Sequence, residues 1–370
     1  MGEPRIINQG GFGCIFFPSV HCEKPNKTDD DKHVSKLVMN DFTSSNEIQI
    51  GKMIKDMIPF YFLYYVPILH HCPASLAKIN KNEIRKCKII EDAENDKFLL
   101  LKMKYIKNKK FNDFLFQNTS KRHFLNVIFD TYSYFIFSLE QLTSLGIVHF
   151  DFKFDNTLID LKTELPLIID FGLSIPIEKM MDSRLYKSYF YGYHPTYSIW
   201  PLEVHVLNYV INEKETLDKA DVWSIINTYV DNCSAFTIFS SHFISRYKNS
   251  CYYFLSQFVG ASQNMIIETC MKYWKTWDNY ALSITYLNVI KFISKRGFTS
   301  NEFLLQFSQI LLYNLHPNPS RRSDYETTRY KYKSIFYTKI DIESYNLLIQ
   351  NFDIPRFKEQ SILLQKSLSR

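Results

Sequence analysis

The sequence lacks an apolar run long enough to cross a membrane. Its longest apolar stretch covers residues 57–69 and is broken by Pro59 and Pro67. A transmembrane helix needs about 20 consecutive apolar residues, so we interpret this stretch as a segment of the core. The N-terminus also lacks the apolar segment of a signal peptide. We therefore expect a soluble protein without a membrane span, located in the cytoplasm.

Cysteine pairs with the spacing CxxC are also missing. The seven cysteines stand at positions 14, 22, 72, 87, 233, 251 and 270. An odd number without such pairs argues against a disulfide framework and for a reducing compartment. A zinc site built from His21, Cys22, His70, His71 and Cys72 would fit no common ligand spacing. We therefore predict buried thiols and ordinary histidines.

A strong excess of charge is absent too. The chain has 44 Lys and Arg against 38 Asp and Glu, a net charge of +6. Its basic residues are scattered, whereas a nucleic-acid-binding protein usually gathers them on one stripe. No specificity for nucleic acid is therefore evident. Hydrophobic residues make up 46% of the chain, which is enough to bury a substantial core and argues against global disorder.

The first hundred residues predict a β-rich region with one helix. Short apolar segments predict two strands joined by a glycine turn over residues 6–20, and further strands over residues 34–39, 88–91 and 98–103. Helix-start residues from Thr43 onward introduce the helix.

The rest of the chain predicts mainly helices. Residues 121–145 form a long apolar helix candidate that ends at Gly146, and several helices are expected over residues 215–315. We predict one region over residues 1–104, a second over residues 105–325, and a C-terminal extension over residues 326–370. This extension is either a helical segment, with an Ile-Leu-Leu helix candidate near its end, or a docking segment.

The strongest chemical signal is the segment HFDFKFDN at residues 149–156. A phosphoryl-transfer enzyme needs a carboxylate to orient and deprotonate the attacking hydroxyl, a cation near the transferred phosphate, and an oxygen ligand for magnesium. Asp151, Lys153 and Asn156 meet these needs in that order. His149 would support the loop from beneath.

A second segment, IIDFG at residues 168–172, brings an aspartate from an apolar strand onto a turn that Gly172 permits. Asp170 could there bind the metal that bridges the β- and γ-phosphates. With these two segments the chain resembles the eukaryotic-type serine/threonine protein kinase family, from about residue 6 to residue 325.

The resemblance implies a two-lobed, protein-kinase-like α+β fold, with a small β-rich N-lobe carrying one main helix and a large, mainly helical C-lobe. It also implies ATP, Mg²⁺ or Mn²⁺, and a protein substrate. The chain also looks like kinases of large nucleo-cytoplasmic DNA viruses in its segments GGFGC and IWPLEVH, its short N-terminal region and its composition. For a viral kinase the expected location is the host cytoplasm or the virion.

The segment NQGGFGCI at residues 8–15 matches the family's glycine loop, whose backbone N–H groups cover the phosphates. Gly10, Gly13 and Ile15 match the pattern, while Asn8 replaces the first glycine; Gly11 lies within the same loop and is a further candidate for nucleotide binding. No G-K-[ST] follows, so this is not a Walker A loop, and glycines between two strands are a poor match to a dinucleotide-binding motif.

Two further segments complete the nucleotide site that the resemblance implies. Lys36 matches the strand lysine that holds the α- and β-phosphates, and Glu47 is its expected ion-pair partner on the following helix. Met103 stands at the gatekeeper position, with Lys104 to Ile106 as the hinge that binds adenine through its backbone.

Three supporting roles follow from the same resemblance. Glu203 ends the activation segment, and either Arg321 or Arg322 pairs with it. Asp221 would support the catalytic loop from a helix.

Phe150 departs from the family pattern. Most regulated kinases carry an arginine there that binds a phosphate on the activation segment, which phenylalanine cannot do. We therefore predict that fully dephosphorylated recombinant enzyme keeps its activity, and a near-total loss would contradict this. Lys153, two residues after the catalytic aspartate, favours serine/threonine over tyrosine specificity, which phosphoamino-acid analysis of a substrate pool would test.

Two alternative functions stay open. A small-molecule phosphotransferase of the aminoglycoside or choline kinase type shares part of the catalytic segment, but Lys153, the DFG segment and Glu203 argue against it. A pseudokinase scaffold usually loses the lysine or an aspartate of the site, and here Lys36, Asp151 and Asp170 are all present. The substrate and the oligomeric state do not follow from the sequence.

Overall fold

The chain forms two compact units in the computed structural model, which describes residues 2–10, 13–22, 24, 28, 30–90, 98–115, 120–293, 301–336 and 339–352. Unit 1 combines Met1–Lys110 with Asn156–Ser174. Unit 2 combines Phe111–Asp155 with Ile175–Arg370. The chain therefore leaves unit 1 after its first third and returns to it for a short segment.

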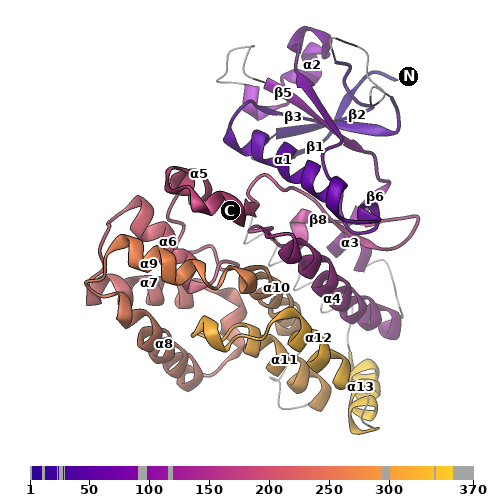
Figure 1. The fold of residues 1–370 in the computed structure, drawn as a ribbon. Coiled ribbons are helices and arrows are strands. Elements are labelled where there is room, and N and C mark those ends of the chain that lie inside the picture. Colours follow the sequence, from indigo (N-terminus) through magenta and orange to yellow (C-terminus); the bar gives the residue numbers. More distant parts are fainter. Residues whose placement is uncertain are drawn as a thin grey trace. The chain divides into compact units, whose positions relative to one another are not determined.

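Unit 1 is built on an antiparallel five-stranded sheet with the strand order β1-β2-β3-β5-β4 (Figure 1). Its strands are β1 (Arg5–Gly10), β2 (Gly13–Phe17), β3 (His33–Met39), β4 (His70–Pro73) and β5 (Phe98–Lys104). The predicted glycine hairpin and the strands at 34–39 and 98–103 are confirmed. Strand β4 was not predicted, because its residues HHCP do not show the apolar alternation of a half-buried strand.

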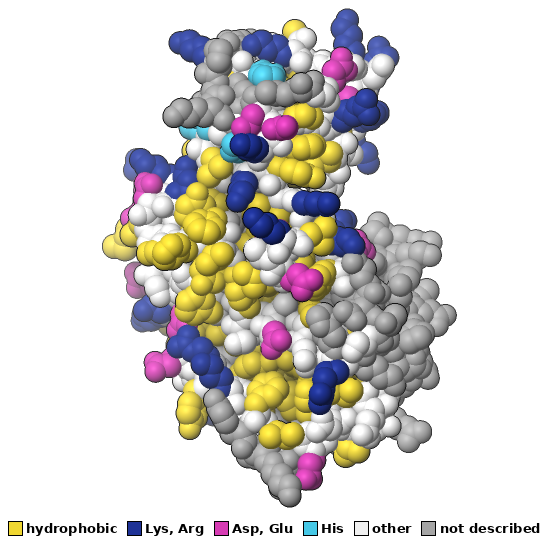
Figure 2. All heavy atoms as spheres, turned by 90° about the vertical axis from the view of Figure 1, so that its right-hand side faces the viewer, with side chains coloured by type: hydrophobic (Ala, Val, Ile, Leu, Met, Phe, Trp, Pro, Cys, Tyr) yellow, Lys and Arg dark blue, Asp and Glu magenta, His cyan; other side chains and the backbone are white. Residues whose placement is uncertain are grey.

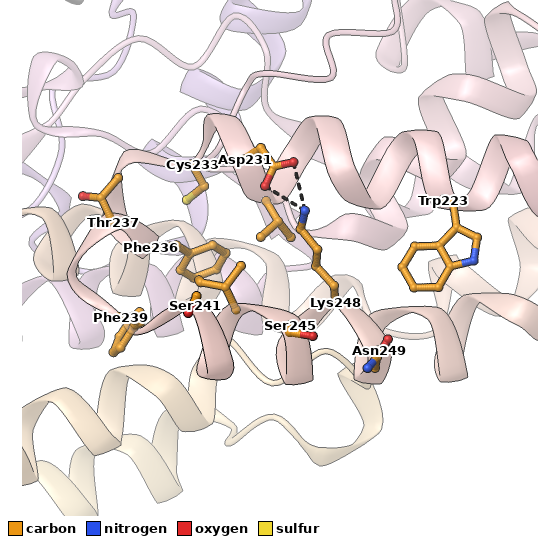
Figure 3. Close-up of a pocket in the computed structure, with 12 residues that line it drawn as sticks. Trp223, Asp231, Cys233, Phe236, Thr237, Phe239, Ser241, Ser245, Lys248 and Asn249 are labelled. Carbon is orange, nitrogen blue, oxygen red and sulfur yellow. Dashed lines mark hydrogen bonds and ion pairs between the residues drawn. The ribbon is translucent and has the colours of Figure 1, made fainter.

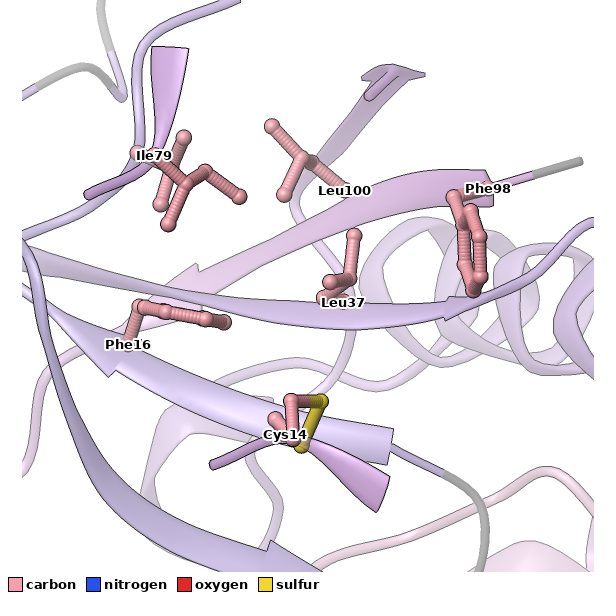
Figure 4. Close-up of a cluster of buried hydrophobic side chains, with 8 residues drawn as sticks. Cys14, Phe16, Leu37, Ile79, Phe98 and Leu100 are labelled. Atoms are coloured by element: carbon pink, nitrogen blue, oxygen red, sulfur yellow. A yellow bond between two sulfur atoms is a disulfide. The ribbon is translucent and has the colours of Figure 1, made fainter. Parts of the chain in front are cut away.

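Both faces of this sheet carry apolar side chains, because neighbouring residues of a strand point to opposite sides. Leu37 and Leu100 belong to a buried cluster on one face (Figure 4). Val38 and Leu101 belong to a second cluster, against which Ile48 of α1 (Phe42–Met57) packs. The Asp41 side chain accepts from the Ser44 backbone N–H and caps this predicted helix.

The cysteines of unit 1 correct the prediction of free thiols. Cys14 is bonded to Cys87, and Cys22 is bonded to Cys72; Figure 4 shows the bond at Cys14. The partners lie 73 and 50 residues apart in the sequence, so local spacing could not reveal them. Disulfides are uncommon in reducing compartments, and the argument from cysteine usage for such a compartment therefore does not hold.

We expect removal of the Cys14–Cys87 bond to destabilise the protein substantially. A disulfide that closes a loop of this length typically stabilises by about 2–4 kcal/mol. Urea unfolding of the Cys14→Ser/Cys87→Ser variant and of the wild type should show this loss. Dithiothreitol should lower the stability of the wild type, and equal stability with and without reductant would show that the bonds do not form.

A three-stranded sheet with the order β6-β8-β9 completes unit 1. Its strands are β6 (Asn108–Lys110), β8 (Thr157–Asp160) and β9 (Pro166–Ile168). The backbone N–H of Val66 donates to the Ile168 carbonyl over 3.0 Å, so the returning segment is anchored in unit 1. The short helical turns of this unit are η1 (Tyr61–Leu63), η2 (Leu76–Lys78), α2 (Lys81–Ile84) and η3 (Lys88–Ile90).

The strand predicted over residues 88–91 is wrong, because η3 is a helical turn there. A run of four residues is too short for its period to distinguish a strand from a helical turn. The N–H of Ile90 donates to the Cys87 carbonyl over 3.2 Å, which closes the turn.

Unit 2 is mainly helical. Its helices are α3 (Phe111–Leu115), α4 (Lys121–Ser144), α5 (Tyr186–Tyr189), α6 (Leu202–Asn212), α7 (Lys219–Asn232), α8 (Ser241–Leu255), α9 (Gln263–Met271), α10 (Trp277–Ile293), α11 (Glu302–Asn314), α12 (Tyr325–Ser334) and α13 (Lys339–Asn351). A two-stranded ribbon pairs β7 (Ile147–Val148) with β10 (Ile175–Pro176). The predicted long helix is α4, and Gly146 follows it with a φ of 71° as a C-terminal cap.

Helices α4 and α10 form the centre of the unit 2 core. Nearly every described side chain of α10 is buried, and the hydroxyls of Thr131 on α4 and Tyr286 on α10 lie 2.8 Å apart. The small β-sheet region and the large helical region confirm the predicted α+β, two-lobed, kinase-like fold.

The predicted C-terminal extension begins inside α12 and continues through α13. Phe352 stacks on Phe124 of α4 with ring centres 5.2 Å apart, and Tyr345 contacts Phe303 of α11 at 4.9 Å. Its first part is therefore packed in unit 2. The Ile-Leu-Leu helix candidate lies outside the described residues, and the predicted limits of the regions stay predictions.

The surface of the described chain mixes charge types. On the face that Figure 2 shows, Lys and Arg side chains lie among acidic, apolar and neutral ones, without a single basic stripe. None of the helices within the described residues is both long and apolar enough to cross a membrane.

Candidate active site

An ion-pair cluster in unit 1 joins three of the predicted site residues, two of which, Lys36 and Glu47, are buried. Lys36 on β3 donates from Nζ to Glu47 Oε2 and to Asp170 Oδ1, each over 2.9 Å. Burial alone would lower the pKa of Lys36, but the charges of Glu47 and Asp170 raise it above its usual range, so the ammonium stays charged. The structure thus brings Lys36 and its expected partner Glu47 together.

Asp170 adopts a backbone conformation that is rare outside glycine. Its φ is 65°, and such strain in a non-glycine residue is typical of functional sites. Its side chain is one third exposed, at 33%. A charged, strained and accessible carboxylate is well suited to a ligand role.

Asn46, which the sequence analysis missed, fixes the segment that follows Asp170. Its buried side-chain amide on α1 donates to the carbonyls of Gly172 (2.9 Å) and Ser174 (2.7 Å). A Cβ at Gly172 would lie 2.7 Å from the Thr43 methyl carbon, so only glycine fits this close approach. Helix α1 therefore holds the DFG turn directly through Asn46, while Glu47 is linked to Asp170 through Lys36.

Asn156 and Asp170 lie at the same end of a strand pair. Asn156 directly precedes β8, Asp170 is the second residue after β9, and Thr157 pairs with Ile168. The N–H of Ile169 donates to the Asn156 carbonyl over 3.0 Å. This placement is what a shared magnesium site would require of the two residues.

The side-chain oxygens of Asp170 and Asn156 fit a magnesium ion that is bound together with a nucleotide. Such an ion takes one or two carboxylate ligands and completes its shell with phosphates and waters. Asp170 and Asn156 would provide hard oxygen ligands of this kind. No cluster of three His, Cys, Asp or Glu side chains that could hold a metal ion occurs among the described residues.

The predicted glycine-loop residues border the β1–β2 hairpin. Gly10 ends β1, Gly13 begins β2, and Ile15 on β2 pairs with Lys36 on β3. Gly11 lies outside the described residues. The hairpin is therefore in register with the strand that carries Lys36.

The predicted hinge lies at the end of β5. Met103 and Lys104 are the last two residues of that strand, and Ile106 follows it. Met103 pairs with Val34 at the start of β3. A role of these residues in binding adenine stays a prediction.

Asp151 and Lys153 are in direct contact within unit 2. Lys153 Nζ lies 3.0 Å from Asp151 Oδ1, and the N–H of Asp151 donates to His149 Nδ1 over 3.3 Å. Tyr197 completes this cluster: its hydroxyl donates to Asp151 Oδ1, and Lys153 Nζ donates to the hydroxyl over 2.9 Å. Tyr197 was not predicted, because no residue near it in the sequence indicates a contact with Asp151.

The carboxylate that supports the catalytic loop is Asp278, and the prediction of Asp221 is wrong. Asp278 accepts from the backbone N–H groups of His149 (2.6 Å) and Phe150 (2.9 Å). Asp221 instead takes part in the capping box of α7 and pairs with Lys214. Asp278 is the single acidic residue of α10, whose side chains are mostly buried, and this was the signal that could have identified it.

We expect Asp278→Asn to destabilise the protein more than Asp221→Asn. Hydrogen bonds to a charged acceptor are each worth about 1.5–3 kcal/mol, whereas weakening a helix cap costs about 1 kcal/mol. Urea unfolding of both variants measures the difference. A larger loss for Asp221→Asn would contradict the assignment.

Phe150 is buried among aromatic rings. It stacks on Trp200 with ring centres 4.8 Å apart and contacts Phe190 at 5.8 Å and Trp277 at 6.0 Å. Trp200 Nε1 donates to the Phe150 carbonyl over 2.7 Å. Aromatic contacts thus fill the space around this side chain, where a phosphate-binding kinase would place a cation.

Glu203 and Arg322 form a bidentate ion pair. Arg322 Nη1 lies 2.5 Å from Glu203 Oε1, and Nη2 lies 2.9 Å from Oε2. Both side chains are almost fully buried. The structure thereby decides between the two predicted arginines, since Arg321 is exposed.

A separate open cavity of about 630 Å³ lies between α7 and α8 of unit 2 (Figure 3). Trp223, Phe236 and Phe239 contribute apolar walls, and Lys248 pairs with Asp231 across it at 2.7 Å. None of the predicted catalytic or metal-binding residues lines it.

Comparisons with known proteins agree with this picture. No family model matches the chain. Serine/threonine-protein kinase 1 of African swine fever virus (isolate Pig/Kenya/KEN-50/1950) is 24% identical to it over 187 residues, which cover 48% of this chain and 62% of the viral protein. The chain thus matches less than two thirds of that relative's length. It is similar to a viral serine/threonine protein kinase in about half of its sequence and has a kinase-like fold.

Proposed function

We propose that this chain is an ATP-dependent serine/threonine protein kinase of viral origin that acts in the host cytoplasm or the virion. The observation that carries the proposal is the ion-pair cluster of Lys36, Glu47 and Asp170. Three residues from separate motifs meet there. Lys36 has the positive charge that suits the phosphates of a nucleoside triphosphate, and Asp170 has the negative charge that suits its metal ion. The similarity to a viral serine/threonine kinase supports the same function.

In this proposal the residues of unit 1 bind the nucleotide. Lys36 holds the α- and β-phosphates, and Glu47 orients it. The glycine loop covers the phosphates with backbone N–H groups, and the residues after β5 bind adenine. Asn156 and Asp170 would hold Mg²⁺, or Mn²⁺ in its place, which neutralises the charge of the phosphates when bound.

The residues of unit 2 act on the protein substrate. Asp151 orients the acceptor hydroxyl and takes its proton as the hydroxyl oxygen forms a bond to the γ-phosphorus. The bond between the γ-phosphorus and the bridging oxygen breaks, and ADP leaves. Lys153 stabilises the negative charge on the transferred group.

A phosphorylation assay on a protein and peptide library tests this function. The full chain is incubated with γ-labelled ATP and Mg²⁺, and the labelled amino acids are identified. We expect phosphoserine and phosphothreonine. Phosphotyrosine alone would contradict the substrate class, and label only on small molecules such as choline or an aminoglycoside would contradict the protein kinase function.

A further inference from the structure

A short segment of unit 1 packs on the β1–β2 hairpin. This segment, which we call the strap, comprises residues 74–90 and follows β4. It consists of the helical turns η2, α2 and η3, which are three or four residues long. Helical turns of this length are not stable on their own, so contacts with the sheet hold the strap in place.

The strap is attached to both strands of the hairpin. Glu83 Oε2 accepts from the backbone N–H of Ile6 on β1 over 2.8 Å, and Cys87 is bonded to Cys14 on β2. Ile79 is buried in the apolar cluster that also contains both cysteines (Figure 4). Among these contacts the disulfide is covalent, so its loss changes the attachment of the strap most.

The cysteine on the hairpin lies beside residues that are proposed to bind ATP. Cys14 directly follows Gly13 on β2, and the next residue, Ile15, pairs with Lys36 on β3. The disulfide at Cys14 therefore restrains the end of β2 that joins the glycine loop. Donor groups that are held in position before a ligand arrives bind it more tightly, because less order has to be imposed on binding.

We propose that the disulfide between Cys14 and Cys87 is a redox switch for the affinity of the glycine loop for ATP. The inference rests on the proposed kinase function and adds a regulation to it. In the oxidised state the strap restrains the hairpin, and ATP binds tightly. In the reduced state the strap is released from β2, and ATP binds more weakly. The chain would thus bind ATP more weakly in a reducing compartment than in an oxidising one.

A dithiol reductant operates the switch by thiol–disulfide exchange. One thiolate of the reductant attacks a sulfur of the bond and forms a mixed disulfide, and its second thiolate then displaces the protein sulfur. Each protein sulfur gains an electron and a proton, and the reductant becomes a disulfide. Because Cys14 is 0% and Cys87 1% exposed, the strap has to open locally before the attack. Most of its residues are exposed or half-buried, which favours such local opening.

The second disulfide of unit 1 provides a matched control. Cys72 lies on β4, and Cys22 lies between β2 and β3, so this bond does not include a residue of the hairpin strands. A reductant breaks both bonds. The double variants Cys22→Ser/Cys72→Ser and Cys14→Ser/Cys87→Ser therefore separate their effects.

The test measures the dissociation constant for ATP with Mg²⁺ by titration calorimetry, on the oxidised, the dithiothreitol-treated and the reoxidised full chain. Mass spectrometry identifies the free thiols, and circular dichroism monitors the fold. We expect the constant to rise about tenfold on reduction, a usual strength of coupling between two sites, and to return on reoxidation. Cys22→Ser/Cys72→Ser should show the same rise, whereas Cys14→Ser/Cys87→Ser should bind ATP weakly with and without reductant.

The same coupling has to act in the opposite direction. If reduction weakens ATP binding by a given factor, saturating ATP shifts the equilibrium between disulfide and thiols toward the disulfide by that factor. Labelling of the Cys87 thiol in a dithiol redox buffer, with and without ATP, measures this shift. A disulfide equilibrium that does not respond to ATP would contradict the inference.

Three further results would overturn it and leave the kinase function intact. The first is an unchanged dissociation constant after Cys14 and Cys87 have become free thiols. The second is that both thiols are already free before the reductant is added. The third is a loss of ATP binding together with the circular dichroism signal, which would show global unfolding. A chain that binds ATP in neither state and leaves the peptide library unlabelled would refute the kinase function itself, and the inference with it.

Discussion

Asp151→Asn is expected to lower the turnover number for phosphoryl transfer on the order of 1,000-fold, because a positioned general base contributes about 10²–10⁴-fold. Asparagine keeps the size of the side chain and its contact with Lys153, but it cannot take the proton of the acceptor hydroxyl. The Michaelis constant for ATP should change little, since the residues proposed to bind ATP lie in unit 1. Steady-state assays with γ-labelled ATP and a library peptide measure both values.

Asp155→Asn is the matched control for this variant. Asp155 stands in the same loop and loses the same charge, but its side chain is exposed. We expect this variant to keep most of the wild-type activity. Equal, near-zero rates for the wild type and Asp151→Asn would instead favour a binding scaffold without chemistry.

Arg322→Met is expected to lower the free energy of unfolding by about 3–5 kcal/mol, the usual cost of removing one partner of a buried ion pair. The side chain of Glu203 is fully buried, with 0% exposed to solvent, and it would keep its charge there. The guanidinium also donates from Nε to the His316 carbonyl over 3.0 Å, so the variant would leave more than one acceptor without its donor. Urea denaturation followed by circular dichroism measures the effect.

The neighbouring Arg321 provides the control, because it carries the same charge on an exposed side chain. Arg321→Met should change stability by less than about 0.5 kcal/mol. Replacing Glu203 and Arg322 together by methionine should cost less than the sum of the single changes, since no buried charge is left unpaired. Additive losses would show that the two side chains do not act as a pair.

Most of the site residues that could be predicted lie in local sequence motifs. The segments around Asp151 and Asp170 each place their groups within a few residues, so spacing alone describes the chemistry. Lys36 and Glu47 were predicted from the resemblance to the kinase family, as a strand lysine and its partner on the following helix, and their 2.9 Å contact agrees. The long apolar helix was predictable because its period and its glycine cap are also local signals.

Contacts between distant segments could not be predicted. Asp221 had the expected sequence pattern, yet Asp278 supports the catalytic loop because α10 occupies the centre of the unit 2 core. The disulfide between Cys22 and Cys72 depends on the pairing of β4 with β5, and the sequence analysis did not predict β4.

The sequence by itself determined the proposed chemistry of residues 149–156, because Asp151, Lys153 and Asn156 bring the side chains for a base, a cation and a metal ligand into one short segment. Only the tertiary structure decided what surrounds these groups. It brought Asp278 into hydrogen-bonding contact with the backbone of the loop, Arg322 into an ion pair with Glu203, and the Tyr197 hydroxyl into a hydrogen bond with Asp151. Strand register and helix packing determine which distant residues meet, and neither is encoded in the spacing of a single motif.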